Sequence, residues 1–440
     1  MKRRQFLTTT VTGIAGGIVF RHLPVHAFNS TIPASERINV GLIGVRNMGW
    51  ANLRDFLSQP GIICKALVDV DQRELERRAS DVLDTGQKKP DLYGDYRKML
   101  EDKEIDVVIV GTPDHWHCLH TVDSLEAGKH VYVEKPLANS IAEINVMLDT
   151  ARKTGKKVQV GQQQRSGAHW KSAIELVKTG KLGKIRQVKY WGNFAYGAGR
   201  NPVPDSDPPP EVDYNTWLGP APLKPFNQNR FHGSWRMFRN YGGGLMTDWG
   251  VHLIDMGLWG MDVKQAPNSV TAMGGTFAHM DNALEWPDTL HVHYDMGDYM
   301  MTWEHNGGLQ TGPWGRNYGV AFLGSNGTLV ADRDNWEVIA EWDQDQDKFR
   351  IDKGKQVKTD NMSHVNHVAN FVKAIREDEE LNCDIEKGHR AALFAHLGNL
   401  AFLTGDKLKY NENSRNFGEG NRANSLLKPE YRKPWQFPVA

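Results

Sequence analysis

Cysteine is scarce in this chain, and its charges of opposite sign cancel. Three cysteines in 440 residues, an odd number spread far apart, argue against a disulfide framework and a cysteine-based metal site. Cys64 and Cys118 lie in or beside apolar segments, so we expect them to be buried thiols. Lysine and arginine total 53, as do aspartate and glutamate, which gives no reason to expect a nucleic acid as partner.

Several motifs that carry chemistry in other proteins are also missing. The 17 histidines form no H-E-x-x-H or comparable ligand spacing, so no metal site is expected. Neither the G-x-x-x-x-G-K-[ST] phosphate loop nor the G-x-S-x-G turn of a nucleophilic serine is present. The sequence also has no long low-complexity tract and no internal repeat. Its length is sufficient for two domains with ample cores.

The first residues predict a targeting segment. Arg3 and Arg4 precede a mildly apolar stretch, residues 7–20, which is shorter than the ~20 residues that a membrane-spanning helix requires. This pattern resembles a twin-arginine export signal with a cleavage site near residues 25–27; a general secretory signal or an uncleaved anchor are the alternatives. We therefore expect a signal peptide over residues 1–27, the twin-arginine export machinery as a partner, no stable membrane span, and a periplasmic or exported location.

A strand, a glycine turn and a helix follow this segment. The apolar run 38–43 leads into the turn 44–49, G-V-R-N-M-G, and then into an amphipathic stretch. Glycines permit a tight turn, and free amides at a helix N-terminus bind a pyrophosphate. A second apolar run, 62–68, ends where an acid would accept hydrogen bonds from a ribose. The cofactor contacts expected here are Gly44, Arg46, Asn47, Met48, Gly49 and Asp69.

Arg46 stands where the G-x-G-x-x-G fingerprint has its middle glycine. Its guanidinium could hold a phosphate, or its bulk could block close approach and mark a decayed site. Asp69 favours NAD because its charge repels a 2'-phosphate, whereas Arg46 and Arg73 could tolerate one. NAD is therefore the expected cofactor, with NADP as the alternative.

Polar segments follow three further predicted strands. Residues 105–110 run into T-P-D-H-W-H, residues 130–133 into Glu134-Lys135-Pro136, and residues 157–160 into G-Q-Q-Q-R. Ligands of open parallel sheets bind outside the carboxyl ends of the strands, so the first two of these segments should face one crevice. Histidines after a strand end can also merely cap or pack. The cofactor contacts expected here are Thr112, Pro113, His117, Glu134, Lys135 and Gln163, with Arg165 nearer the substrate.

The remainder of the chain predicts a second domain. Alternation of apolar and polar residues predicts antiparallel strands with one covered face, at 185–191, 269–277, 290–295, 299–304, 318–323 and 328–331. Such an open sheet leaves a face for another subunit, so a homo-oligomer is expected. The predicted fold is an α/β Rossmann domain over 36–160, followed by an α+β domain over 161–440 for substrate binding and oligomerisation, with a large open, mainly antiparallel sheet.

In order and spacing, the motifs resemble the glucose-fructose oxidoreductase and inositol dehydrogenase family, Gfo/Idh/MocA. The resemblance runs from residue 38 to the C-terminus and rests on the turns above together with Gly242-Gly243-Gly244, Asp248, His252 and Asp255. It implies His252 as the proton-transfer group, Asp248 as its neighbour on substrate or imidazole, and Lys135 as the cation near substrate oxygen and nicotinamide. The substrate contacts expected are Lys135, Arg165, Trp235, Arg236, Asp248 and His252, with the indole of Trp235 stacking on a sugar ring.

Three functions remain open at this point. The resemblance implies an NAD(P)-dependent oxidoreductase that transfers a hydride between nicotinamide and a hydroxyl-bearing carbon of a sugar, sugar derivative or cyclitol. A glycoside hydrolase or lyase that recycles a tightly bound NAD through a keto intermediate is the second, favoured by export because the periplasm offers no obvious pool of free NAD. A non-catalytic dinucleotide-binding protein is the third, and it requires Arg46 to have spoiled the site. Without the other motifs, Asp248 and His252 would be an ordinary pair on a helix surface.

Overall fold

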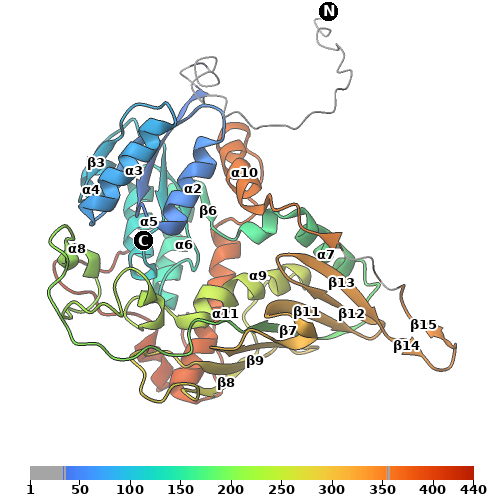
Figure 1. Ribbon diagram of the computed structural model, residues 1–440. Helices are drawn as coiled ribbons and strands as arrows, with labels where there is room; N and C mark the ends of the chain where they lie inside the picture. The colour runs from blue at the N-terminus through green and yellow to red at the C-terminus, as the bar shows by residue number, and fades with distance from the viewer. Residues whose placement is uncertain (1–32, 34–35, 353, 355–356) are drawn as a thin grey trace, which may run out of the picture.

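The computed structural model describes residue 33 and residues 36–352, 354 and 357–440 (Figure 1). The signal peptide expected over residues 1–27 lies outside this part of the chain. The described elements form a six-stranded sheet, an eight-stranded sheet and a small two-stranded hairpin, with helices around both large sheets. Among the helices described, none combines the length and the hydropathy needed to cross a bilayer.

The first sheet is parallel throughout and has the strand order β3-β2-β1-β4-β5-β6. This order belongs to dinucleotide-binding folds, so the predicted Rossmann domain is confirmed. The strand of three residues that no pattern predicted, β3, stands at one edge. The bounds are β1 (Ile38–Ile43), β2 (Ile62–Val68), β3 (Asp91–Tyr93), β4 (Val107–Val110), β5 (His130–Val133) and β6 (Val158–Val160).

The helices of this domain begin at side-chain caps that the sequence supplies. Ser140 accepts a hydrogen bond from the Glu143 amide at 3.2 Å, as in a capping box, and Asp71 caps α3 in the same manner. The buried cysteines Cys64 and Cys118 are free thiols, as expected. The helices are α2 (Asn47–Leu57), α3 (Gln72–Asp84), α4 (Tyr96–Leu100), α5 (Asp114–Glu126) and α6 (Ile141–Thr154).

The second sheet has the order β16-β13-β12-β11-β7-β10-β9-β8, and only its β7–β10 pair is parallel. The expected open, mainly antiparallel sheet is therefore confirmed. Its bounds are β7 (Ile185–Gly192), β8 (Ser269–Gly275), β9 (Thr289–Asp295), β10 (Met300–Asn306), β11 (Tyr318–Gly324), β12 (Gly327–Ala331), β13 (Asn335–Ala340) and β16 (Val357–Lys358), with the hairpin β14 (Trp342–Asp343) and β15 (Lys348–Phe349) beyond them.

One face of this sheet packs on helices, and the other is exposed along β9, whereas β12 is buried on both faces. In β9, Leu290, Val292 and Tyr294 are buried whereas His291 and His293 are exposed, which is the alternation that the sequence displays. The covering helices are α7 (Ala168–Lys178), α9 (Val251–Gly260) and α11 (Ile385–Thr404).

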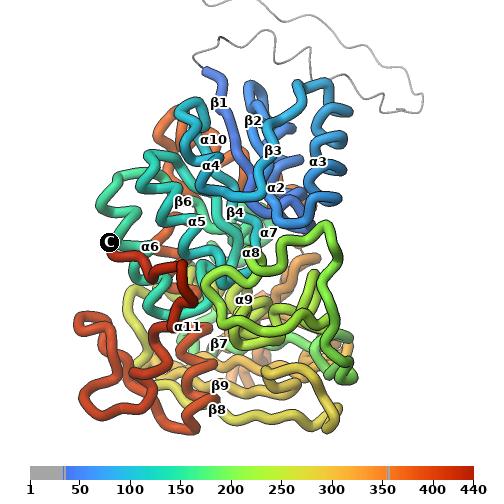
Figure 2. The backbone as a smooth tube through the Cα atoms, turned by 90° about the vertical axis from the view of Figure 1, so that its left-hand side faces the viewer, coloured from blue at the N-terminus to red at the C-terminus, as the bar shows by residue number. Residues whose placement is uncertain are grey.

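A late helix, α10 (Ser363–Glu377), returns to the first domain and packs on α2 (Figure 1). Phe371 of this helix meets Phe56 and Tyr132 edge-on, with ring centroids about 6 Å apart. The domain boundary expected at residue 160 stays a prediction. Although α10 follows this boundary in the sequence, it packs on the first domain. Figure 2 shows a second crossing, in which the green segment around α8 (Tyr214–Leu218) lies against the blue domain.

Candidate active site

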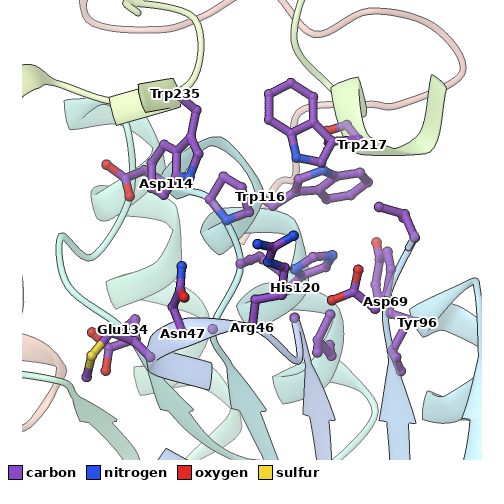
Figure 3. Close-up of a pocket in the computed structure, with 18 of the residues that line it drawn as sticks. Arg46, Asn47, Asp69, Tyr96, Asp114, Trp116, His120, Glu134, Trp217 and Trp235 are labelled. Atoms are coloured by element: carbon purple, nitrogen blue, oxygen red, sulfur yellow. Dashed lines mark hydrogen bonds between the residues drawn. The ribbon is translucent and has the colours of Figure 1, made fainter. Parts of the chain in front are cut away.

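A cavity lies at the carboxyl ends of the parallel strands β1, β2, β4 and β5. Figure 3 shows Arg46 and Asp69 rising from the strand ends, with Trp217 and Trp235 reaching in from the second domain. The structure thus brings together the strand-end segments that the sequence predicted to share a crevice. Among the predicted residues, its wall contains Gly44, Arg46, Asn47, Met48, Asp69, Thr112, Pro113, Glu134, Lys135, Trp235 and Arg236.

The glycine turn has a geometry that fits a dinucleotide. Gly44 has φ +86°, and a Cβ atom there would lie 2.8 Å from the carbonyl carbon of Gly111. Arg46 is the N-cap of α2 and provides no side-chain cap, so the helix amides at the cavity are open to a phosphate. Asp69 accepts hydrogen bonds from the amides of Val45 at 2.8 Å and Asp71 at 3.0 Å, which fixes its carboxylate at the cavity wall. A carboxylate oxygen can accept a further bond from a ribose hydroxyl.

The Arg46 side chain lines this cavity while turning toward acids at its rim. Its guanidinium nitrogen Nη1 lies 3.8 Å from Glu74 and 4.0 Å from Asp71. Half-exposed ion pairs of this length are weak. The guanidinium is therefore held loosely beside the phosphate-binding turn, where it can reach an anion.

Three residues predicted at the cofactor lie outside the cavity wall. A Cβ on Gly49 would lie 1.9 Å from the carbonyl oxygen of Gly44, so this glycine permits α2 to pack on the turn. His117 places its ring nitrogens 2.8 Å from the Pro136 carbonyl and 2.9 Å from the Thr112 carbonyl, and burial lowers its pKa to about 4. As a neutral imidazole with one N–H, His117 donates to one of these carbonyls and lies against the other. Gln163 begins a short 3-10 turn, and its neighbour Gln162 makes the contact described below.

Arg165 and Trp235 also differ from expectation. Arg165 forms a two-pronged ion pair with Asp255, with Nη2–Oδ1 at 2.7 Å and Nε–Oδ2 at 2.8 Å, and lines a separate cavity beside α9 and α11. This placement follows from burial, since a covered guanidinium requires a partner. Trp235 lines the main cavity, but the guanidinium of Arg236 lies over its ring at 4.2 Å. One face of the indole is therefore already occupied by a cation rather than free for a sugar.

Lys135 and Asp248, 113 positions apart, join the two domains at the site. The Lys135 ammonium donates to Asp248 Oδ1 at 2.8 Å and to its carbonyl oxygen at 2.7 Å. Arg236 Nε lies 3.1 Å from Asp248 Oδ1, and the Tyr196 hydroxyl donates to Asp248 Oδ2 at 3.0 Å. Burial alone would raise the pKa of Asp248, but Lys135 and Arg236 outweigh burial and hold it well below its usual range. Asp248 is therefore an ionised anchor for Lys135 and does not need the imidazole as its partner.

His252 is held in one tautomer by an amide. Its Nδ1 lies 3.0 Å from Gln162 Oε1, and the Gln162 amide nitrogen donates to the Val251 carbonyl at 3.5 Å. Because the amide oxygen faces the ring, Nδ1 carries the proton and Nε2 keeps its lone pair. Burial, followed by the positive charges of Lys135 and Arg333, holds the pKa of His252 well below the ordinary 6.5. The imidazole is thus neutral near pH 7 and can accept a proton.

This depressed pKa leads to a direct titration test. Because the charged form is disfavoured, His252 should gain its proton only well below pH 6.5, so a base function would be lost on the acidic side of that value. Removing one neighbouring cation, in Lys135→Met or Arg333→Gln, should raise the pKa. NMR titration of the histidine ring signals, with the His252→Asn variant assigning the peak, measures both effects. A titration midpoint at or above 6.5 in the unaltered protein would contradict this electrostatic picture.

Asp248 belongs to a π-helical turn, η4 (Met246–Gly250), which leads directly into α9. The sequence predicted an ordinary helix after the three glycines, with Asp248 and His252 on one face. In the structure Asp248 faces Lys135 while His252 faces Gln162. π-turns inside helices are frequent at functional sites, because the wider turn redirects side chains.

Four residues near these groups were not predicted at the site. Tyr196 follows β7 in a segment without periodicity. Gln162 contacts His252, whereas the sequence predicted its neighbour Gln163 at the site. Asp114 lines the cavity, and burial raises its pKa well above the usual value, although Arg236 and Lys135 oppose this. Arg333 lies in the turn between β12 and β13, where D-R-D-N looks like a solvated turn. Asp114, inside the T-P-D-H-W-H segment, and Gln162, inside the G-Q-Q-Q-R segment, carried a usable sequence signal.

Comparisons with known proteins agree with this architecture. The family model for the oxidoreductase family with an NAD-binding Rossmann fold matches residues 38–162, and that for its C-terminal alpha/beta domain matches residues 170–313 and 349–437. Among solved structures, levoglucosan dehydrogenase with NADH and L-sorbose has a TM-score of 0.65 at 19% identity, covering 85% of this chain and 98% of that one. An NAD-binding oxidoreductase from Klebsiella pneumoniae has a TM-score of 0.64 at 21% identity, covering 85% and 99%. These structures share the fold.

Curated relatives match over a shorter stretch. A glycosyl hydrolase family 109 protein from Shewanella sp. (strain MR-4) and the alpha-N-acetylgalactosaminidase of Shewanella oneidensis are each 28% identical over 202 residues. The match covers 42% of this chain and 44% of each relative, less than half of their length. The two family models, in contrast, together span most of the chain. The protein therefore belongs to the Gfo/Idh/MocA oxidoreductase family and has NAD as its cofactor.

Proposed function

We propose that the protein transfers a hydride between NAD and a hydroxyl-bearing carbon of a sugar, sugar derivative or cyclitol. The observation that carries this proposal is the group formed by Lys135, Asp248 and His252. Lys135 lines the nucleotide cavity and is held by Asp248, and its charge acts on the neutral imidazole of His252. Bound NAD would supply the hydride acceptor.

Each side chain then has a defined task. As the substrate carbon loses its hydride, the hydroxyl proton passes to Nε2 of His252, whose lone pair Gln162 keeps available. The Lys135 ammonium, fixed by Asp248, stabilises the negative charge that develops on the substrate oxygen. The carbon–oxygen single bond becomes a carbonyl. This arrangement of a base and a cation argues for catalysis and against a binding protein without turnover.

The proposal is tested by a carbohydrate panel. Protein purified with its bound nucleotide is mixed with free sugars, cyclitols and aryl glycosides, while reduced nicotinamide and products are followed together. Net reduced cofactor with a ketone or lactone product supports the proposal. Absence of both with every compound would overturn it.

A second candidate, glycoside cleavage with a retained NAD, is favoured by a strap over the nucleotide cavity. We define the strap as residues 211–217 together with His232. Asp213 donates its amide to the Val70 carbonyl at 2.9 Å, and the Glu211 carbonyl accepts from the Gln72 amide at 3.0 Å. His232 Nε2 lies 2.9 Å from Asp71 Oδ2. The strap is thus fastened to the loop that follows Asp69.

A fastened strap suits a redox-neutral cycle. Thr216, Trp217 and His232 line the cavity, and the Trp217 carbonyl accepts a hydrogen bond from the Trp116 indole at 3.0 Å. A nucleotide beneath them could leave only after these contacts open. In such a cycle a ring carbon is oxidised, the aglycone is eliminated, and the hydride returns, so no free NAD is needed. The Shewanella relatives named as glycosyl hydrolase and alpha-N-acetylgalactosaminidase support this candidate.

Loosening the strap should release the nucleotide faster. Gln72 is the first residue of α3, where proline is tolerated, so Gln72→Pro removes one fastening amide without breaking the helix. His232 has φ +61°, which asparagine tolerates, and His232→Asn removes the bond to Asp71. Loss of two hydrogen bonds of about 0.5–1.5 kcal/mol each should speed release of bound NAD about tenfold in the double variant.

The measurement is exchange of bound NAD against labelled NAD. Ala168→Pro is the matched control, since Ala168 is the exposed first residue of α7, away from the strap. Equal exchange rates in the double variant and in the unaltered protein would show that the strap does not retain the nucleotide.

We further propose that the chain is exported by the twin-arginine route to the periplasm and assembles with copies of itself through the exposed face of the second sheet. Met273, on this face, is 80% exposed. Light scattering that shows only monomer would contradict the proposed assembly. Cell fractionation tests the proposed export to the periplasm.

A further inference from the structure

Three strand ends of the second sheet meet beside the catalytic group. Tyr318 begins β11 opposite Gly192 at the end of β7, and Ala331 at the end of β12 pairs with Val320 of β11. Arg333 follows Ala331 in the next turn. Residues that follow or begin these strands therefore share one edge of the sheet, the edge that holds Asp248 and its helix.

An aromatic platform covers this edge, formed by Phe194, Trp249 and Tyr318. Trp249 directly follows Asp248 and stacks on Phe194, with ring centroids 4.3 Å apart, and its ring is tilted against Tyr318 at 4.8 Å. The guanidinium of Arg333 lies over the Trp249 ring at 4.3 Å. This contact holds the guanidinium next to the residue that anchors Lys135.

Arg333 differs from the other cations of the site in its charge balance. Arg236 and Lys135 share the carboxylate of Asp248, at 3.1 and 2.8 Å. Arg333 belongs to none of the ion pairs among the described residues, and its neighbour Asp332 pairs with Arg316 at 2.7 Å. Arg333 is half-buried, and burial lowers the pKa of its guanidinium. A poorly solvated cation without a carboxylate costs stability, unless a ligand pairs with it.

The charge of Arg333 reaches the reacting groups. It lowers the pKa of His252. In turn, the charges of Asp248, Tyr196 and Glu134 raise the pKa of Arg333. Because its guanidinium lies over Trp249, the residue that follows Asp248, Arg333 stands on the second-domain side of the group formed by Lys135, Asp248 and His252. The nucleotide phosphates, in contrast, belong at the Gly44 turn of the other domain.

We propose that Arg333 binds an anionic group on the carbohydrate, so that the substrate class is a negatively charged sugar such as a uronic acid. The planar fork of guanidinium donors matches a carboxylate, and its position over Trp249 holds it beside Asp248. This inference rests on the proposed function, because it names the class of substrate for that reaction. The binding of an anionic sugar can nevertheless be measured without turnover.

The test uses pairs of methyl glycosides that differ only at one carbon: glucoside and glucuronide, galactoside and galacturonide. Calorimetry on the protein with its bound nucleotide gives each dissociation constant. We expect a uronide to bind about tenfold or more tightly than its neutral partner, because hydrogen bonds to charged groups are the stronger ones. Arg333→Gln should abolish this preference while leaving the affinity for the neutral member unchanged, and Arg333→Lys should retain part of it.

Controls separate this inference from general electrostatics and from turnover. Arg186→Gln removes an exposed cation at the opposite end of β7 and should leave the preference intact. Reduced nicotinamide is recorded in the same samples, so a uronide that binds without reduction counts against the proposed function alone. Equal binding of both members of each pair, a preference that survives Arg333→Gln, or no binding of either uronide overturns the inference. A sulfated sugar that binds better than the uronides would retain the anion site and change the anion.

Discussion

Replacing His252 with asparagine is expected to lower kcat by about 10²–10⁴-fold, the usual contribution of a positioned general base. The imidazole is the group that offers a free Nε2 lone pair, and it does so because Gln162 holds Nδ1–H at 3.0 Å. Asparagine cannot accept the proton at neutral pH. Binding of NAD should persist, because His252 belongs to the second domain and the glycine turn to the first.

Turnover of the carbohydrate identified by the panel, measured at saturating concentration, checks this effect. His389→Asn is a matched control, because His389 is also buried and its ring also faces an amide oxygen, with Nε2 2.8 Å from Asn145 Oδ1, and it does not line the nucleotide cavity. The control variant should keep its kcat if it folds to the same circular dichroism spectrum. An unchanged kcat in His252→Asn would exclude this residue as the base.

Changing Lys135 to methionine is expected to lower kcat by about 10²–10³-fold, as loss of one donor to a developing oxyanion does. Methionine keeps most of the side-chain volume and removes the charge. Asp248 would retain Arg236 and Tyr196 as partners, so the fold of the site should survive. The pKa of His252 should rise in the same variant, which links this prediction to the titration described above.

Lys189→Met is the control for Lys135→Met. Lys189 also pairs with a carboxylate, Glu304 at 2.9 Å, but on the second sheet and outside the cavity. Loss of activity in both lysine variants would indicate a general effect of charge removal. Full activity in Lys135→Met would show that the ammonium does not touch the reacting oxygen.

The Rossmann half of the fold could be predicted because its signals are local. Apolar runs such as 38–43 and 62–68 end at a glycine turn and at Asp69, and each strand end points to the same edge of a parallel sheet. The free N-terminus of α2 follows from the same few residues. The antiparallel second sheet could also be predicted, since alternation in β9 shows directly which side chains are buried.

Contacts across the two domains could not be derived from local patterns. Lys135 was predicted near the reaction, but its anchor is reached across 113 positions and through a π-turn that no propensity indicates. Tyr196 and Arg333 come from loops without periodicity, where a charge normally looks solvated. His117 was predicted at the cofactor, and its ring lies against two backbone carbonyls, because polar residues after a strand end can brace the backbone as readily as they bind a ligand.

The absorbance of bound nicotinamide tests the central claim most directly. Protein carrying its own NAD is mixed rapidly with the carbohydrate panel, and the reduced cofactor is followed through a single turnover in the unaltered protein and in Lys135→Met and His252→Asn. The account predicts a rise in reduced nicotinamide with at least one carbohydrate in the unaltered protein, and little or none in either variant. No rise with any carbohydrate, or the same rise in the variants, would contradict it.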